Sequence, residues 1–178
     1  VKGYEQVNAM KVIILPNNKN IFMAAQSAAE VVYVNASVVE TRTVPQVFTS
    51  LLAFDPSQSI EANVEDMTAS LSDVTSGSVT LAVRDTTIDG LEIHENDILG
   101  MVDGNILVST PDMDQALLDT FDKMIDEDSE IVMIYVGEEG NQEQAQALAE
   151  KLEEAHEDIE VEIFQGDQPV YPYLFSVE

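Results

Sequence analysis

A group of amide and ammonium side chains follows an apolar run near the start of the chain. The run Val12–Leu15 ends at a proline, and Asn17, Asn18, Lys19 and Asn20 come next, before an alanine-rich segment. Strand, polar loop and helix form ligand sites at the carboxyl edge of parallel sheets, and free N–H groups at a helix start bind anions. Asparagine also caps helices and forms turns, so a helix start capped by Asn18 or Asn20 is the alternative. A nucleotide is disfavoured, because the loop lacks a glycine-rich phosphate motif.

A second polar group surrounds one of the two arginines of the chain. Arg42 stands between Thr41 and Thr43, just ahead of Pro45, which suits the first turn of a helix. A guanidinium at this position can bind a carboxylate of a ligand or of a partner in a forked arrangement. It can equally pair with a nearby acidic side chain. We therefore take Thr41, Arg42 and Thr43 as candidate binding residues.

Three further candidates lie in the second half of the chain. Arg84 precedes Asp85 in an expected strand, which favours an internal ion pair. Tyr171 and Tyr173 stand in the proline-punctuated end of the chain. Exposed tyrosines are good anchors at protein interfaces, whereas buried ones belong to the core.

The sequence offers no arrangement typical of a catalytic or metal site. His94 and His156 stand apart from any nucleophile that would need a base, and no metal-ligand spacing accompanies them. The acid-rich segments 126–130 and 153–162 lack the spacing of a calcium loop. With no cysteine in the chain, disulfides and thiolate chemistry are excluded as well. We expect no catalytic residue, no metal and no cofactor in this chain.

Strands and helices alternate along the chain. Apolar or alternating segments predict strands at 12–15, 31–36, 78–85, 130–137 and 159–166, and a last short strand at the end. Helices are expected after residue 20, from Pro45, from residue 59, from a Thr110 cap and after residue 141. Asp103-Gly104 between two apolar runs predicts a β-hairpin. This pattern indicates an α/β fold.

The character of the sequence changes near residues 75–78, from helical to strand-rich. Segments 12–29 and 131–149 also echo each other as strand, polar loop and alanine-rich helix. We therefore expect two small α/β lobes, residues 1–78 and 79–178, with mainly parallel sheets and a β-hairpin insertion. The chain begins with valine and with polar, helix-like residues, so it is expected to be a piece of a longer protein.

The net charge of −27 is concentrated in the second half of the chain. Residues 1–90 carry 5 basic and 10 acidic side chains, whereas residues 91–178 carry 2 basic and 24 acidic ones. Such a surface repels nucleic acid and anionic membranes. It complements a basic protein partner, or it serves solubility alone. No apolar run approaches the ~20 residues of a membrane span, so no membrane insertion and a cytoplasmic location are expected.

Several stretches together resemble the C-terminal region of the bacterial fatty acid kinase catalytic subunit family, FakA, also described as YloV-like or dihydroxyacetone-kinase-like. They run in order from about residue 9 to the end: VIILPNNKNI, TRTVPQ, LLAFDP, AVRDTTIDGLEI, ILGMVDGNI and QPVYPYLFSVE. The resemblance implies the two-lobed architecture of DegV-type lipid-binding proteins and of the dihydroxyacetone kinase substrate subunit.

The resemblance also implies a function. A kinase domain elsewhere in the full-length family protein binds ATP and magnesium, and a DegV-type carrier presents a fatty acid for phosphorylation. The region that this chain resembles is then non-catalytic by itself and recruits the carrier. Two alternatives stay open: a domain that forms a homodimer, and a small-molecule or lipid site between the lobes, lined by residues 17–20 and 41–43. Neither His94 nor His156 matches the substrate-binding histidine of dihydroxyacetone kinase.

Overall fold

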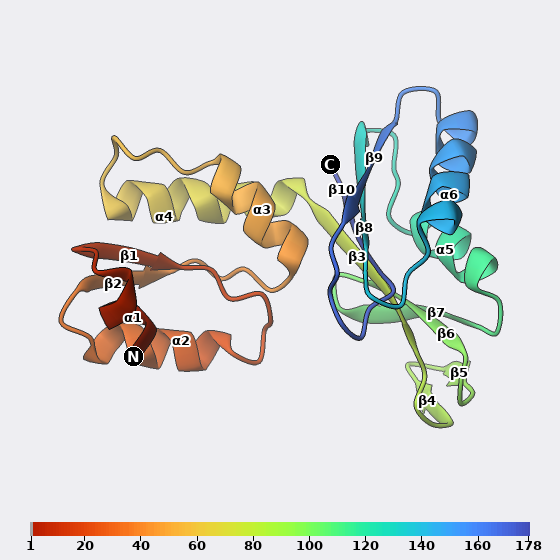
Figure 1. Cartoon of the computed structure of the whole chain (residues 1–178), viewed down its shortest axis with the longest axis horizontal. Coiled ribbons are helices and arrows are strands. Elements are labelled where there is room, and N and C mark those ends of the chain that lie inside the picture. Colours follow the sequence, from red (N-terminus) through yellow and green to blue (C-terminus); the bar gives the residue numbers. More distant parts are fainter. Residues whose placement is uncertain (1) are drawn as a thin grey trace. The chain divides into compact units, whose positions relative to one another are not determined.

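The chain divides into two compact units at Val74. The computed structural model describes residues 2–178, the side chain of Glu5 excepted, and its units are residues 1–74 and 75–178 (Figure 1). The boundary expected after residue 78 falls inside a strand, β3 (Thr75–Leu81).

Unit 1 is a parallel pair of strands between helices. In residues 2–74 the elements are α1 (Lys2–Val7), β1 (Lys11–Ile14), α2 (Phe22–Val31), β2 (Asn35–Val38), α3 (Val44–Leu52), α4 (Ile60–Ala69) and a 3-10 turn, η1 (Ser70–Asp73). β1 and β2 pair in parallel, with Val12 opposite Ala36. α1 and α2 lie on one face of this pair, and α3 and α4 lie on the other (Figure 1).

Polar caps start the helices α3 and α4. The side chain of Thr43 accepts a hydrogen bond from the backbone N–H of Gln46, and that of Ser59 accepts one from Ala62. Each bond satisfies an N–H that the first helical turn leaves without a backbone partner. Pro45 lies in the first turn of α3, as predicted.

Unit 2 is built on a larger sheet. In residues 75–178 the elements are β3, β4 (Thr86–Ile88), β5 (Leu91–Ile93), β6 (Ile98–Val102), β7 (Asn105–Thr110), α5 (Met113–Phe121), β8 (Ile131–Val136), α6 (Gln142–Ala155), β9 (Glu160–Gln165) and β10 (Tyr173–Val177). Six strands form one sheet in the order β7-β6-β3-β10-β8-β9, and β4 pairs with β5. α5 and α6 lie on the same side of the sheet (Figure 1).

The α/β class is confirmed, but the strand directions in unit 2 correct the expectation of mainly parallel sheets. Within residues 75–178, β8 and β9 are parallel, whereas β7, β6, β3, β10 and β8 pair antiparallel in succession. The hairpin makes β6 and β7 antiparallel neighbours, β6 runs opposite to β3, and β10 inserts between β3 and β8 and runs opposite to both. Local patterns cannot place a terminal strand in the middle of a sheet.

The predicted hairpin at Asp103-Gly104 is confirmed. It joins β6 to β7, and both residues have positive φ, 47° and 82°. Asp89-Gly90 joins β4 to β5 with φ of 49° and 86°. Positive φ at both central positions is typical of the tight turn that matches the twist of antiparallel strands.

The principal core of unit 2 lies between the sheet and its two helices. Phe121 of α5 and Phe175 of β10 are both fully buried, and their ring centroids are 4.6 Å apart. Burying such a side chain contributes ~1.5–3 kcal/mol. The expected Thr110 cap is wrong, because Thr110 ends β7 and the side chain of Asp112 accepts the capping bond from Gln115.

The helices of the described residues are short. The longest, α6, has 14 residues, and in the range 2–178 none combines the length and the apolar character needed to cross a membrane.

Candidate functional site

Two polar loops of unit 1 meet beyond the carboxyl ends of β1 and β2. The buried hydroxyl of Thr41 donates a hydrogen bond to the carbonyl of Pro16, which joins the loop after β2 to the loop after β1. Nearby, the N–H of Val39 donates to the carbonyl of Ile14 over 3.0 Å. Parallel pairing brings the two carboxyl ends to one edge. The structure therefore brings the predicted residues 17–20 and 41–43 together.

The asparagines of the first loop do not cap α2, which corrects that expectation. Ile21 occupies the cap position, and within the described residues it makes no side-chain capping bond. The Asn18 side chain instead accepts from the backbone N–H of Asn20, two residues on, over 2.8 Å. This is the turn chemistry of asparagine. Asn17, Asn18, Lys19 and Asn20 are all exposed, so the loop offers amide and ammonium groups on the surface.

Arg42 pairs with a local acid. Its Nη2 lies 2.8 Å from Oε1 of Glu40, with both side chains about half exposed, and its backbone N–H donates to Oε1 of Gln46. Thr43 is occupied as the cap of α3. Of the two alternatives for Arg42, the structure shows the ion pair with a neighbouring acidic side chain. An exposed ion pair contributes little free energy, so Arg42 can exchange Glu40 for another carboxylate at little cost.

Unit 1 also contains an apolar pocket that the sequence did not indicate. Its volume is ≈ 350 Å³, and it is lined by Lys11, Ile13, Leu15, Leu51, Phe54, Pro56, Gln58, Ile60, Asn63 and Met67. The size is at the lower end for small-molecule sites. Residues of β1, of the end of α3 and of α4 contribute to its wall. Because these residues are mostly apolar and far apart in the sequence, no local sequence pattern indicates the pocket.

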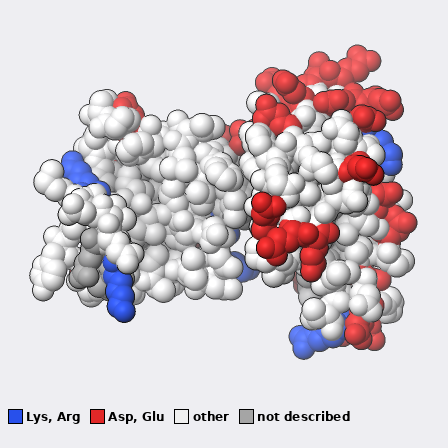
Figure 2. Space-filling view, in the orientation of Figure 1, with Lys and Arg blue, Asp and Glu red and all other residues white. Residues whose placement is uncertain are grey.

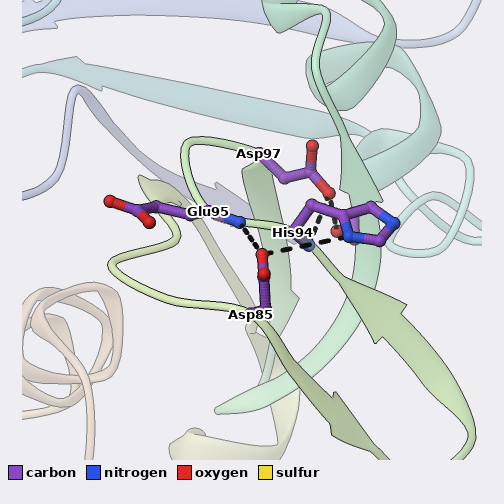
Figure 3. A network of polar contacts seen from close by, with 5 residues as sticks. Asp85, His94, Glu95 and Asp97 are labelled. Carbon is purple, nitrogen blue, oxygen red and sulfur yellow. Dashed lines mark hydrogen bonds and ion pairs between the residues drawn. The ribbon is translucent and has the colours of Figure 1, made fainter.

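Arg84 does not pair with Asp85, so the expected internal ion pair is wrong. In the described part of the chain no salt bridge involves Arg84, which is exposed. Asp85 accepts from the backbone N–H of Glu95 over 2.7 Å and lies 3.9 Å from Nδ1 of His94 (Figure 3). Arg84 and Asp85 lie between β3 and β4, not in the strand expected there, and Asp85 turns toward the β5–β6 loop.

Asp97 closes the loop between β5 and β6. Its Oδ2 accepts from the backbone N–H of His94 and from the hydroxyl of Ser109, both over 2.9 Å, and Figure 3 shows the group. These two bonds hold the pKa of Asp97 below its usual value, against the opposing effect of burial. The group orders a loop and resembles no acid–base pair.

The two tyrosines near the C-terminus have different roles. Tyr173 is 1% exposed, and its hydroxyl accepts from the N–H of Asn141 over 2.8 Å and lies 2.8 Å from Oε1 of Gln144. Burial raises the pKa of this hydroxyl. Tyr173 is therefore a core residue that holds the start of α6. Tyr171 is half-buried, and its carbonyl accepts from the side chain of Gln168.

Among residues 2–178, no group of three His, Asp or Glu side chains is arranged to hold a metal ion. Asp and Glu side chains gather on unit 2, whereas the visible face of unit 1 carries few charges (Figure 2). The predicted candidates thus form one polar edge in unit 1, exposed at residues 17–20 and Arg42 with Thr41 buried beneath, and scattered positions in unit 2.

Comparison with known proteins identifies the family. The C-terminal family of FakA-like fatty acid kinase proteins matches residues 1–178. The chain belongs to this family. Protein YloV of Bacillus subtilis is 46% identical over 178 residues, which are all of the chain and 32% of that protein. The FakA-like chain thus spans about a third of the length of this curated relative.

Solved structures share the fold of the FakA-like chain at low sequence identity. The Streptococcus pneumoniae Fatty Acid Kinase (Fak) B3 protein loaded with linoleic acid has a TM-score of 0.67 and 13% identity, covering 99% of this chain and 75% of its own. A DegV family protein of Thermus thermophilus, described for fatty acid binding, has a TM-score of 0.63, 15% identity and the same coverage.

The dihydroxyacetone kinase operon co-activator Dha-DhaQ has a TM-score of 0.55 and 13% identity, covering 99% of this chain and 68% of its own. The expected likeness to DegV-type and dihydroxyacetone-kinase-related architecture is confirmed.

Proposed function

We propose that this chain recruits a DegV-type fatty-acid-binding protein to a fatty acid kinase, and that it is non-catalytic by itself. The observation that carries the proposal is membership of the FakA-like C-terminal family over all 178 residues. The kinase, ATP and magnesium would belong to other parts of a longer protein, in keeping with the 32% share of YloV that the chain covers. Such a kinase would act in the cytoplasm.

Recruitment gives a non-catalytic domain a direct effect on rate. Phosphorylation of a carrier-bound fatty acid needs the carboxylate and ATP to meet in one orientation. Holding two reactants in a productive geometry removes a large entropic part of a barrier, up to ~7–11 kcal/mol in the best intramolecular cases. A docking domain supplies a share of this by keeping the carrier at a high local concentration.

The charge of unit 2 indicates the electrostatic character of the partner. Residues 75–178 contain 3 basic and 26 acidic side chains, and Figure 2 shows the acidic groups spread over this unit. Potentials of opposite sign steer two proteins together and weaken as salt screens them. A carrier with a basic docking face therefore fits this surface, and its association should be faster at low salt.

Calorimetric titration at low and high salt tests the proposal. The 178-residue chain is titrated with each purified, fatty-acid-loaded DegV-family protein of the same organism. We expect binding that weakens as salt rises, and weaker binding for Glu154→Lys and Glu157→Lys on exposed parts of unit 2. Glu65→Lys, an exposed position on α4, is the matched control. Absence of binding at both salt concentrations would refute recruitment by this chain.

Self-association through unit 1 is a second candidate function, favoured by the exposed side of α2. Within the described residues α2 has no buried side chain, although seven of its ten residues are apolar. Met23 and Val31 are 68% and 66% exposed. A helix that is apolar on most sides is normally buried. Sedimentation of the chain over a range of concentrations tests this: a dimer supports it, and a monomer at the highest concentration excludes it.

A further inference from the structure

The sheet of unit 2 has one face without helices. α5 and α6 lie on the same side (Figure 1), where they pack against Val132, Ile134 and Phe175. Side chains one position away along each strand point to the opposite face. In residues 75–178 no further helix covers that face, where Phe164 is exposed and Ser76 and Ser176 are buried.

A row of side chains crosses this open face from strand to strand. The register places Phe164 of β9 beside Tyr135 of β8, Tyr135 beside Leu174 of β10, and Leu174 beside Ser78 of β3. Met101 of β6 follows Ser78. With neighbouring strands ~4.8 Å apart, the row is about 19 Å long.

The composition of this row is unusual for a face that meets water. Antiparallel sheets with one solvated face normally place polar residues on it. Here Phe164 is 41% exposed, and Tyr135, Leu174 and Met101 are half-buried. The Tyr135 and Phe164 rings stack with centroids 5.6 Å apart. A stacked, ordered aromatic pair is the kind of anchor that dominates protein interfaces.

A strained loop borders the same face. Thr80 lies on this side of β3, two residues after Ser78, and its hydroxyl donates to the carbonyl of Val170 over 3.1 Å. Val170 has a φ of 75°, and its side chain is 65% exposed. Positive φ is a rare conformation for a β-branched residue. The loop thus presents an apolar side chain at the border of the row in a conformation that costs free energy.

Acidic groups lie beside the row. Burial raises the pKa of the Tyr135 hydroxyl, a hydrogen bond with Ser176 opposes this, and the nearby charges of Glu178 and Glu162 raise the pKa further. The face is therefore a largely apolar strip with carboxylates next to Tyr135. Its complement is a surface with an apolar centre and lysine or arginine beside it.

We propose that the row Phe164–Tyr135–Leu174–Ser78–Met101, with Val170 at its border, is the docking surface for the fatty-acid carrier. This inference rests on the proposed recruiting function and assigns it to one face of unit 2. The occupant is a protein surface with an apolar patch flanked by basic side chains. Phe164 and Tyr135 form the aromatic end of the row, and the acidic remainder of unit 2 steers the approach.

Matched strand variants test the assignment. Leu174→Thr and Tyr135→Thr each change one side chain of the row. Leu107→Thr is the matched control, because it replaces leucine by threonine at an exposed position of β7 that lies outside the row. Each variant and the parent chain are titrated with the same loaded carrier, after circular dichroism and thermal unfolding confirm the fold. Loss of either anchor side chain is expected to raise the Kd about tenfold or more, whereas Leu107→Thr leaves it unchanged.

The possible outcomes distinguish an error in the proposed docking surface from an error in the proposed recruiting function. Weaker binding by both row variants, with normal binding by Leu107→Thr, supports the assignment. Equal binding by all variants overturns the surface and leaves recruitment standing. If the parent chain binds no carrier, recruitment and this surface both fail. If the row variants abolish self-association and carrier binding stays normal, the occupant is a second copy of the chain, and the assignment to the carrier is overturned.

Discussion

At the scale of single residues, buried hydroxyl groups join distant segments of this chain. Thr41 is fully buried and its hydroxyl bonds to Pro16, 25 positions earlier. Tyr173 bonds to Asn141, 32 positions earlier. A buried polar group left without its partner costs ~1–3 kcal/mol, so these bonds fix loops that local sequence leaves undetermined.

Removing the Tyr173 hydroxyl tests this role. In Tyr173→Phe the backbone N–H of Asn141 loses its acceptor, and the bonds of the Tyr173 hydroxyl to Asn141 and Gln144 are lost as well. We expect the free energy of unfolding to fall by ~1–3 kcal/mol. Urea denaturation measures the change. Tyr33→Phe is the control, since Tyr33 is fully exposed and such surface changes stay within ~0.5 kcal/mol. Equal stability of the two variants would show that the hydroxyl contributes nothing.

Asp97 makes the stability of the β5–β6 loop depend on pH. Its pKa is lowered in the folded state, chiefly by the N–H of His94 and the hydroxyl of Ser109. The unfolded state then binds the proton more readily, so the stabilisation is present above the unfolded value of about 3.9 and is lost as pH falls through the folded value.

Asp97→Asn should therefore differ most from the parent chain near neutral pH. We expect the difference in the free energy of unfolding to shrink as pH falls below about 4, because the parent carboxylate then takes up its proton first in the unfolded state and, at lower pH, in the folded state. Urea denaturation across the pH range measures it, with Asp128→Asn at an exposed position as control. A difference that stays constant with pH would contradict the role of the charge.

At the scale of elements, turns were the most accurately predicted features. The Asp103-Gly104 pair predicted a hairpin because few residues adopt positive φ at both central positions. The prediction of a Thr110 cap failed by two positions, since β7 continues through Thr110 and Asp112 supplies the cap. Cap residues are interchangeable in type, and only the end of the preceding strand decides which one is used.

Gly104→Ala tests the backbone requirement of the hairpin. Gly104 has a φ of 82°, and none of the described atoms lies within 4 Å of an added Cβ, so the cost is conformational alone. We expect a loss of ~1–2 kcal/mol, measured by thermal or urea unfolding. Gly3→Ala, in helix α1, is the control and should be neutral or stabilising. A Gly104→Ala chain as stable as its parent would refute the argument.

At the scale of the whole molecule, the two units differ in the size of their cores. The main core cluster lies within residues 75–178, and in the described part of the chain α2 buries no side chain. Local opening needs less free energy where few apolar contacts are lost. Unit 1 should therefore be the less protected of the two.

Hydrogen exchange followed by mass spectrometry checks this expectation. Amides of β1, β2 and α2 should exchange faster than those of β3, β8 and β10, whose ladders lie inside the six-stranded sheet. Addition of a binding partner that covers unit 1 would slow the first group. Equal protection of both groups in the chain alone would mean that unit 1 is as stable as unit 2.

The features that neighbouring residues set were predictable from the amino-acid sequence. These are the alternation of strands and helices, the Asp103-Gly104 turn, the helix start near Pro45 and the concentration of charge in the second half of the chain. Each follows from short-range sterics, hydrogen bonding or composition, which act over a few positions.

Which distant residues meet became visible only in the folded chain. The fold places β10 between β3 and β8, buries Tyr173 and exposes Arg84. It also puts Tyr135 and Phe164 on a face without helices, although the segment around Tyr135 has the apolar pattern of a strand buried on both faces. The physical reason is that the apolar pattern of a strand shows how much of its surface can be buried. Which other strands and helices cover that surface depends on the tertiary structure.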